Sequence, residues 1–122
     1  MNFLLIDATL NKINFFSKFK NNYYSKSLKK NNEEFTISLF IFLNENNIKL
    51  SEISHLFINQ GPGNFSGIRT SIAVAKGLSI VNKIDIYGFN SGDLKDGKYT
   101  NIVFLLEKGK LKKNLIKPVY MS

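Results

Sequence analysis

The chain has 122 residues, of which 43% are hydrophobic and 13% aromatic, and these values predict one folded domain rather than a disordered segment. The absence of cysteine excludes disulfides, thiolate metal sites and a cysteine nucleophile. The single histidine, His55, leaves few residues from which a zinc site or a catalytic triad could be built. The net charge of +8 comes from scattered lysines and one arginine, so it indicates a compositional bias more than a nucleic-acid site.

No purely apolar run is longer than Leu39 to Leu43, which is far short of the ~20 residues that span a bilayer. The first residues lack the basic region and cleavage site of a signal peptide. We therefore expect a cytoplasmic protein with no membrane partner.

Three strands are predicted at the start of the chain. Phe3 to Ile6 is a continuous apolar run, typical of a strand buried on both faces, and a turn follows at Ala8 to Asn11. The next segment predicts a half-exposed strand, because its apolar and polar residues fall on opposite parities, with Phe16 as an exception: Ile13, Phe15 and Phe19 on one, and Asn14, Lys18 and Lys20 on the other. After an Asn21-Asn22 turn, residues 23 to 28 are expected to form a third, antiparallel strand.

The segment from Phe35 to Leu43 fits both a strand and a helical stripe. We predict a helix, because Asn31 or Asn32 can cap it and Glu33 and Glu34 complement its N-terminal dipole. Its apolar arc is wider than one sheet contact requires. The helix is therefore either deeply buried or in contact with a partner.

A short buried strand is predicted at Leu56 to Ile58, followed by a loop at residues 61 to 64. Ser66 is expected to cap a helix that runs to about Val81, and a strand at Ile84 to Phe89 follows. The resulting β-β-β-α-β-α-β order predicts an α/β fold with a mixed sheet, whose parallel crossovers run through the helices.

The last part of the chain carries weaker signals. Residues 90 to 100 are rich in Gly, Asp and Lys and indicate a linker, and Ile102 to Leu106 is a further strand candidate. The tail from Leu111 to Met121 contains Pro118 and suggests an edge strand. We place the main domain at residues 1–92 and treat residues 93–122 as a reduced remnant or closing strands.

The segment from Ile58 to Arg69 contains the most informative loop. Gly61 and Gly63 allow backbone angles closed to other residues, and Pro62 stiffens the turn between them. The loop fails the P-loop and dinucleotide spacings, because no Gly-Lys pair or third glycine falls at the required distance. On spacing alone, a packed strand–turn–helix junction and a functional loop both stay open.

The residues of this segment, taken in order, resemble those of a known protein family. The string Gly61-Pro62-Gly63-Asn64-Phe65-Ser66-Gly67-Ile68-Arg69 and the helix Ser71 to Leu78 resemble the TsaB family, within the group related to TsaD. Leu4 to Thr9 and Lys117 to Met121 resemble its first and closing strands. The resemblance implies an actin-like (ASKHA) N-terminal domain. With about 30 residues after Gly92, the family's second domain is expected to be largely missing.

The resemblance also implies a function. Family members lack the chemistry of TsaD and support threonylcarbamoyladenosine formation in tRNA by pairing with TsaD and with the ATPase TsaE. We therefore expect a non-catalytic scaffold without a cofactor, a TsaD-like partner, a TsaE-like ATPase as a further partner, indirect tRNA involvement, and self-association into a homodimer as an alternative in isolation. The residues after Asp7 are consistent with a non-catalytic role, because they include no glycine that would let a phosphate approach the backbone.

The helix after the loop offers a surface for a partner. Thr70, Ala73 and Gly77 form a smooth strip that would let another helix approach closely, although packing within the chain explains it equally well. Arg69 lies in the first helical turn against the dipole, which predicts a carboxylate partner. We assign these four residues, with Phe35 and Leu39, to a partner interface, and residues Gly61, Pro62, Gly63, Ser66 and Gly67 to a structural loop.

A second class of function stays open. The Gly61 loop and the basic tail could instead form a small anion-binding or RNA-contacting domain, because a helix N-terminus and clustered lysines both attract phosphate.

Overall fold

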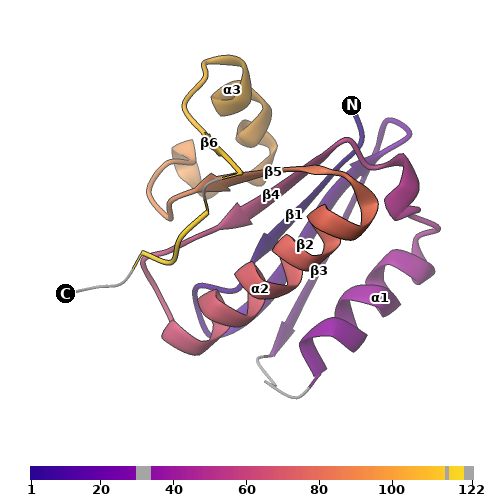
Figure 1. The fold of residues 1–122 in the computed structure, drawn as a ribbon, viewed down its shortest axis with the longest axis horizontal. Helices are drawn as coiled ribbons and strands as arrows, with labels where there is room; N and C mark the ends of the chain where they lie inside the picture. The colour runs from indigo at the N-terminus through magenta and orange to yellow at the C-terminus, as the bar shows by residue number, and fades with distance from the viewer. Residues whose placement is uncertain (30–33, 115, 120–122) are drawn as a thin grey trace.

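The computed structural model describes residues 1–29, 34–114 and 116–119. Its centre is a six-stranded sheet in the order β3-β2-β1-β4-β5-β6 (Figure 1). The strands are β1 Phe3–Asp7, β2 Lys12–Phe19, β3 Asn22–Lys29, β4 His55–Asn59, β5 Asp85–Phe89 and β6 Lys112–Lys113. β1 pairs antiparallel with β2 and parallel with β4, and β4 pairs parallel with β5. The mixed sheet and the element order expected from the sequence are confirmed.

The opening meander forms because each strand meets a tight turn. β1 is buried along its whole length, as its continuous apolar run predicts. β2 and β3 are joined through Lys20 and Asn21, whose φ angles of 50° and 66° fit a two-residue hairpin turn. Phe16, which broke the alternation, faces the opposite side of the sheet from Phe15, and both faces carry an apolar core.

Two helices cover one face of the sheet. α1 (Phe35–Glu45) and α2 (Phe65–Asn82) lie beside each other on this face (Figure 1). Beneath them is the larger core, to which β1 contributes Leu4 and Ile6 and α2 contributes Ile68 and Ile72. The predicted helix at residues 35–43 is confirmed, whereas Asn31, Asn32 and Glu33, proposed at its start, lie outside the described residues.

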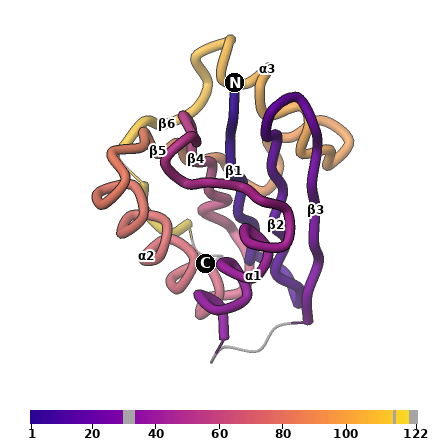
Figure 2. Tube along the Cα trace, turned by 90° about the vertical axis from the view of Figure 1, so that its right-hand side faces the viewer, coloured from indigo at the N-terminus to yellow at the C-terminus, as the bar shows by residue number. Residues whose placement is uncertain are grey.

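The other face of the sheet is covered by the end of the chain. α3 (Ile102–Glu107) lies across the sheet from α2 (Figure 2). Its Ile102 is buried with Leu94 against Phe3 and Phe57 of the sheet. Residues 95–101 form two short 3₁₀ turns rather than an open linker.

The strand predicted at Ile102–Leu106 is wrong, because this segment is α3. A short apolar run has no period that separates a strand from a buried helix. The apolar second face of the sheet needs a cover, and the edge of β5 is already paired with β6. Of the predicted tail strand, Lys112–Lys113 alone is a strand among the described residues. The tail then continues past the buried Ile116 to Val119, whose N–H donates to the Gln60 carbonyl (2.7 Å).

The start of α2 differs by two residues from its prediction. Its N-cap is Asn64, whose side chain accepts a hydrogen bond from the N–H of Gly67 (3.2 Å). Ser66, expected as the cap, lies within the first turn and donates to the same Asn64 oxygen (3.2 Å). Asn and Ser both serve as caps, so the residue types alone allowed either position.

Candidate functional site

The glycine loop between β4 and α2 is packed from two sides. Gly61 has a φ of 112°, a region that favours glycine, and a Cβ there would overlap the backbone oxygen of Val119. A Cβ at Gly63 would overlap the backbone of Thr9 in the β1–β2 turn. Pro62 is half-buried between them. Both glycines are therefore required by close backbone approach.

Main-chain groups of this loop already have partners. The Gly61 N–H donates to Asn59 Oδ1 (2.9 Å), and the Asn64 N–H donates to the Thr9 carbonyl (2.6 Å). The Ser91 N–H donates to the Gly61 carbonyl (2.8 Å). These bonds tie the loop to its neighbours, and the N–H groups of Gly61 and Asn64 are not directed at a bound anion. The geometry favours a structural junction over a phosphate cradle.

Asp7, at the end of β1, holds two other segments in place. Its Oδ1 accepts from the N–H and the hydroxyl of Thr9 (3.1 and 2.7 Å), and its Oδ2 accepts from the Tyr99 hydroxyl (2.8 Å). Burial, the negative charge of Asp7 and the hydrogen bond to it raise the pKa of Tyr99 well above its usual value. Tyr99 therefore stays protonated and donates to Asp7. The pattern around Asp7 gave no sign of this contact, because its partner lies far along the chain.

His55, the one histidine, occupies a structural position at the start of β4. The Ser54 hydroxyl lies 2.7 Å from its Nδ1 and also donates to the Asn2 carbonyl (2.9 Å). Because that hydroxyl has one proton, we assign the Nδ1 proton to His55, which leaves Ser54 without a base to activate it. The ring stacks on Tyr87 at 5.4 Å, and desolvation by burial lowers the pKa of His55. No group of metal-ligating side chains occurs within the described part of the chain.

The two helix residues of α1 assigned to a partner interface are instead part of the core. Phe35 is 4% exposed and Leu39 is 0% exposed, and both pack toward the sheet. The same helix turns Ile37, Phe40 and Ile41 outward, all large and exposed. The assignment of Phe35 and Leu39 is thus corrected: the apolar arc of α1 is wide because the helix has both a buried face and an exposed apolar face.

The smooth strip of α2 faces outward. Arg69, Ala73 and Gly77 are exposed, and Thr70 beside them is half-buried. Apart from its chain neighbours and the nearby backbone of α2, no atom of the described residues lies within 4 Å of the place that a Cβ would occupy at Gly77, so they give no packing reason for a glycine here. Sequence reasoning missed Ile80 and Val81, which continue the strip and are 78% and 79% exposed.

Arg69 has a different neighbour from the one predicted. Its guanidinium lies 5.2 Å from the centre of the Phe65 ring, at the start of the same helix. Within residues 1–29, 34–114 and 116–119 it makes no ion pair. A carboxylate for Arg69 would have to come from outside these residues.

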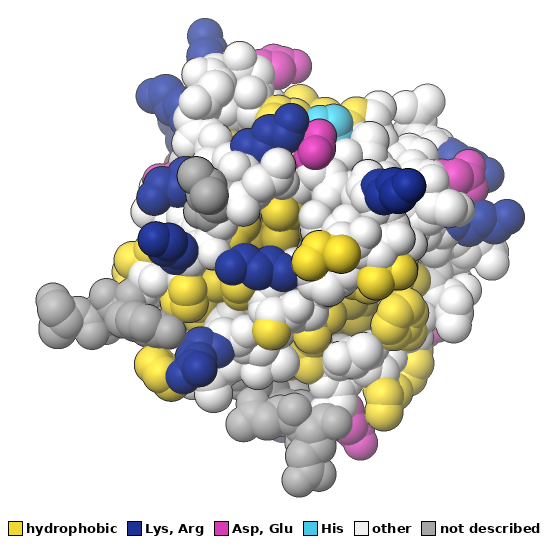
Figure 3. Space-filling view, in the orientation of Figure 1, with side chains coloured by type: hydrophobic (Ala, Val, Ile, Leu, Met, Phe, Trp, Pro, Cys, Tyr) yellow, Lys and Arg dark blue, Asp and Glu magenta, His cyan; other side chains and the backbone are white. Residues whose placement is uncertain are grey.

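Exposed apolar side chains gather over both helices. In the orientation of Figure 1, the space-filling view shows hydrophobic groups across the area where α1 and α2 lie (Figure 3). We call this area the helical surface; its members are Ile37, Phe40, Ile41, Phe65, Ala73, Gly77, Ile80 and Val81. Scattered apolar residues are normal on proteins, whereas a contiguous apolar area is typical of an interaction surface. Among the described helices, none combines the length and the apolar character needed to cross a bilayer.

Known structures share this architecture. YeaZ from Pseudomonas aeruginosa matches with a TM-score of 0.68 and 18% identity over 74% of this chain and 45% of its own. A second structure, described as an uncharacterized protein with similarity to peptidase YEAZ from Pseudomonas aeruginosa, gives 0.68 and 18% over 73% and 43%. The fold is therefore the actin-like (ASKHA) α/β fold.

Sequence comparison adds the family. The TsaB protein of Buchnera aphidicola subsp. Schizaphis graminum (strain Sg), named for tRNA threonylcarbamoyladenosine biosynthesis, is 41% identical over 44 residues, 36% of this chain and 21% of that protein. Its counterpart in Buchnera aphidicola subsp. Baizongia pistaciae (strain Bp) is 45% identical over 38 residues, 31% and 17%. The family model TsaD, tRNA N6-adenosine threonylcarbamoyltransferase, matches residues 25–94. The chain therefore belongs to the TsaD-related family that this model describes. Its aligned segments are similar to the two TsaB proteins and span about a fifth of the length of these relatives.

Proposed function

We propose that this protein is a non-catalytic scaffold subunit that supports formation of threonylcarbamoyladenosine in tRNA by pairing with a TsaD-like protein. A TsaE-like ATPase joins the pair as a further partner, and tRNA is reached through them. Family membership supports the pathway. The observation that carries the pairing is the helical surface, an apolar area with no cover from the chain's own described residues.

The shape of the helical surface favours a helix as its partner. Ala73 and Gly77 leave a shallow strip along α2, and Ile80 and Val81 supply apolar area at its end. Two helices approach to about 8–10 Å where the facing side chains are small. Arg69, exposed beside the strip, can pair with a carboxylate on the partner.

The non-catalytic role rests on the groups at the end of β1. Asp7 is followed by Ala8-Thr9-Leu10-Asn11, which offers no glycine for close approach of a phosphate. Its carboxylate is already occupied by Thr9 and Tyr99. The arrangement supports a structural role for Asp7 rather than a place for a nucleotide or a metal.

Co-expression with the TsaD-like protein of the same organism tests the pairing. A tag on this chain should retain the partner through purification, and light scattering should give the mass of a one-to-one complex. Charge placed on the helical surface by Ile41→Glu should abolish the complex, while Phe104→Glu, at an exposed apolar residue of α3 on the other face of the sheet, serves as the control of equal charge. Recovery of this chain alone, or as a homodimer that excludes the partner, would contradict the proposal.

A further inference from the structure

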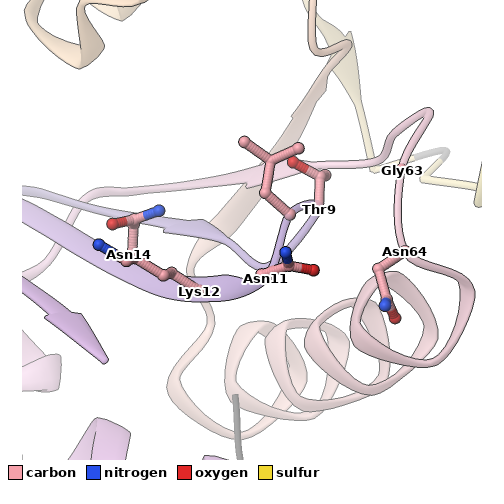
Figure 4. A pocket seen from close by; sticks show the side chains of 7 residues that line it. Thr9, Asn11, Lys12, Asn14, Gly63 and Asn64 are labelled. Carbon is pink, nitrogen blue, oxygen red and sulfur yellow. The ribbon is translucent and has the colours of Figure 1, made fainter. Parts of the chain in front are cut away.

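Two hollows lie at the end of the sheet where β1 and β2 meet, and none of the residues of the helical surface is among those that line them. The first, about 490 Å³, is formed between the second face of the sheet and the turn at residues 97–100. The second, about 610 Å³, lies beside the β1–β2 turn and the start of α2. Asn14 lines both hollows, so they lie on either side of this residue. Figure 4 shows the second hollow, with Lys12 and Asn14 coming from β2 and Asn64 from the start of α2.

The wall of the first hollow is aromatic. The rings of Phe16 and Tyr99 lie there with their centres 5.8 Å apart. Tyr99 is held by its hydrogen bond to Asp7, whose Oδ2 accepts from the Tyr99 hydroxyl (2.8 Å). The ring is thus fixed before any ligand arrives, which reduces the entropy lost on binding.

The other groups around the first hollow are polar. Ser25 and Ser27 project from β3, and Thr100 lies opposite them in the turn. Within the described residues none of the three hydroxyls makes a hydrogen bond. An aromatic wall facing hydroxyl groups fits a flat ligand that carries hydrogen-bonding groups at its edge, as a nucleobase does.

The charged residues that line the two hollows are lysines, and one of them, Lys26, is paired with Glu45 (2.7 Å). Lys98 lines the first and Lys12 the second, and neither makes an ion pair with the residues described here. No Asp or Glu is among the described residues that line either hollow. Lys18 adds a positive charge nearby: its ammonium lies 5.5 Å from the centre of the Tyr23 ring, and that ring stacks on Phe16. This pattern suits a phosphate backbone that passes from one hollow to the other.

We propose that the two hollows form a binding site for single-stranded RNA. An unpaired base lies against Phe16 and Tyr99 with its edge toward the serine hydroxyls, and the phosphates on either side contact Lys98 and Lys12. Aromatic walls with flanking lysines are the usual means by which proteins hold unpaired nucleotides. The site differs from the Gly61 loop and basic tail considered from the sequence. It goes beyond the proposed scaffold role, because the chain alone carries it and the helical surface takes no part.

The first test separates this site from general charge attraction. Fluorescence anisotropy with a labelled hexauridylate should give an affinity that falls about tenfold or more in Lys12→Gln/Lys98→Gln at ~0.05 M salt. The control is Lys108→Gln/Lys110→Gln, which has the same net charge and should lose less than about twofold. Equal losses in both variants would overturn the proposal, since the binding would then follow total charge alone.

The second test isolates stacking. Tyr99→Phe and Tyr99→Leu both lose the bond to Asp7, but Tyr99→Phe alone keeps the ring. Binding should be within about twofold of the parent protein in Tyr99→Phe and weaker by about fivefold or more in Tyr99→Leu, in line with the usual effect of losing one stacked base. Circular dichroism checks that both variants are folded to the same extent. Equal affinities of the two variants would overturn the stacking assignment.

Two further ligands identify the source of the nucleotide. Adenosine monophosphate should bind far more weakly than the hexanucleotide, because it offers one phosphate instead of several. A double-stranded RNA of equal length should also bind more weakly, since its bases are not free to enter the hollow. A mononucleotide or a duplex that binds as tightly as the single strand would overturn the RNA assignment. A negative outcome here leaves pairing with the TsaD-like protein untouched.

Discussion

Replacing Gly77 by leucine should raise the stability of the isolated protein while it blocks association. Gly77 lies in the interior of α2, and a side chain there points into open space. Glycine is about 0.8–1 kcal/mol less favourable than alanine inside a helix, and leucine is close to alanine. Gly77→Leu should therefore stabilise the fold by about 0.8 kcal/mol. For a domain of this size that corresponds to a rise of about 2–5 °C in melting temperature.

At a helix–helix contact the same change has the opposite sign. The leucine side chain fills the strip through which the partner helix approaches, and overpacking of this kind costs about 1–3 kcal/mol. Association should weaken by about 5- to 150-fold, since 1.4 kcal/mol corresponds to a factor of ten. Gly77→Ala is the matched control: it gains nearly the same helix stability and adds a single methyl group, so it should retain most of the affinity.

Two measurements on each variant show whether Gly77 lies at the partner interface: thermal unfolding of the isolated chain by circular dichroism, and the mass of the complex by light scattering. A fall in melting temperature for Gly77→Leu would mean that Gly77 is packed inside the monomer. A rise in melting temperature with unchanged association would place the interface elsewhere.

Other predictions follow from single contacts. Asn64→Ala removes the cap of α2 and should lower the free energy of unfolding in urea by about 1 kcal/mol, while Ser66→Ala should cost less than half as much; equal costs would contradict the cap assignment. Tyr99→Phe removes the hydrogen bond to Asp7 and should lower the free energy of unfolding by about 1 kcal/mol; an unchanged value in urea denaturation would show that this bond does not hold the turn. The lowered pKa of His55 means that the folded state disfavours its protonation, so stability should fall as pH drops from about 7.5 to 5.5, and His55→Gln should flatten that part of the profile; an unchanged slope would refute it. Calorimetry with Mg-ATP should show no micromolar binding, because no glycine follows Asp7.

Much of the fold could be predicted from the sequence because its signals are local. The buried run of β1, the alternation in β2 and the glycine loop before α2 each gave the correct element type. The apolar Phe16 at a polar position of the alternation is explained by the structure, which has an apolar core on each face of the sheet. A strand that is assumed to be buried on one face alone is not expected to have an apolar residue at that position.

The errors arose where long-range packing decides. Ile102–Leu106 forms a helix because an aromatic sheet face must be covered, and no local pattern reveals that need. Phe35 and Leu39 were assigned outward because the sequence shows the width of an apolar arc but not its direction. The contact from Tyr99 to Asp7, which shapes the first hollow, joins residues too distant for any motif to link.

The central claim is that this chain supports tRNA modification by pairing through its helical surface. The most direct measurement is reconstitution of threonylcarbamoyladenosine formation on tRNA from purified TsaD-like and TsaE-like proteins, with and without this chain. We predict that product forms when the parent chain or Gly77→Ala is added, and that Gly77→Leu fails to support the reaction despite its higher stability. Equal product without the chain, or with Gly77→Leu, would contradict the account.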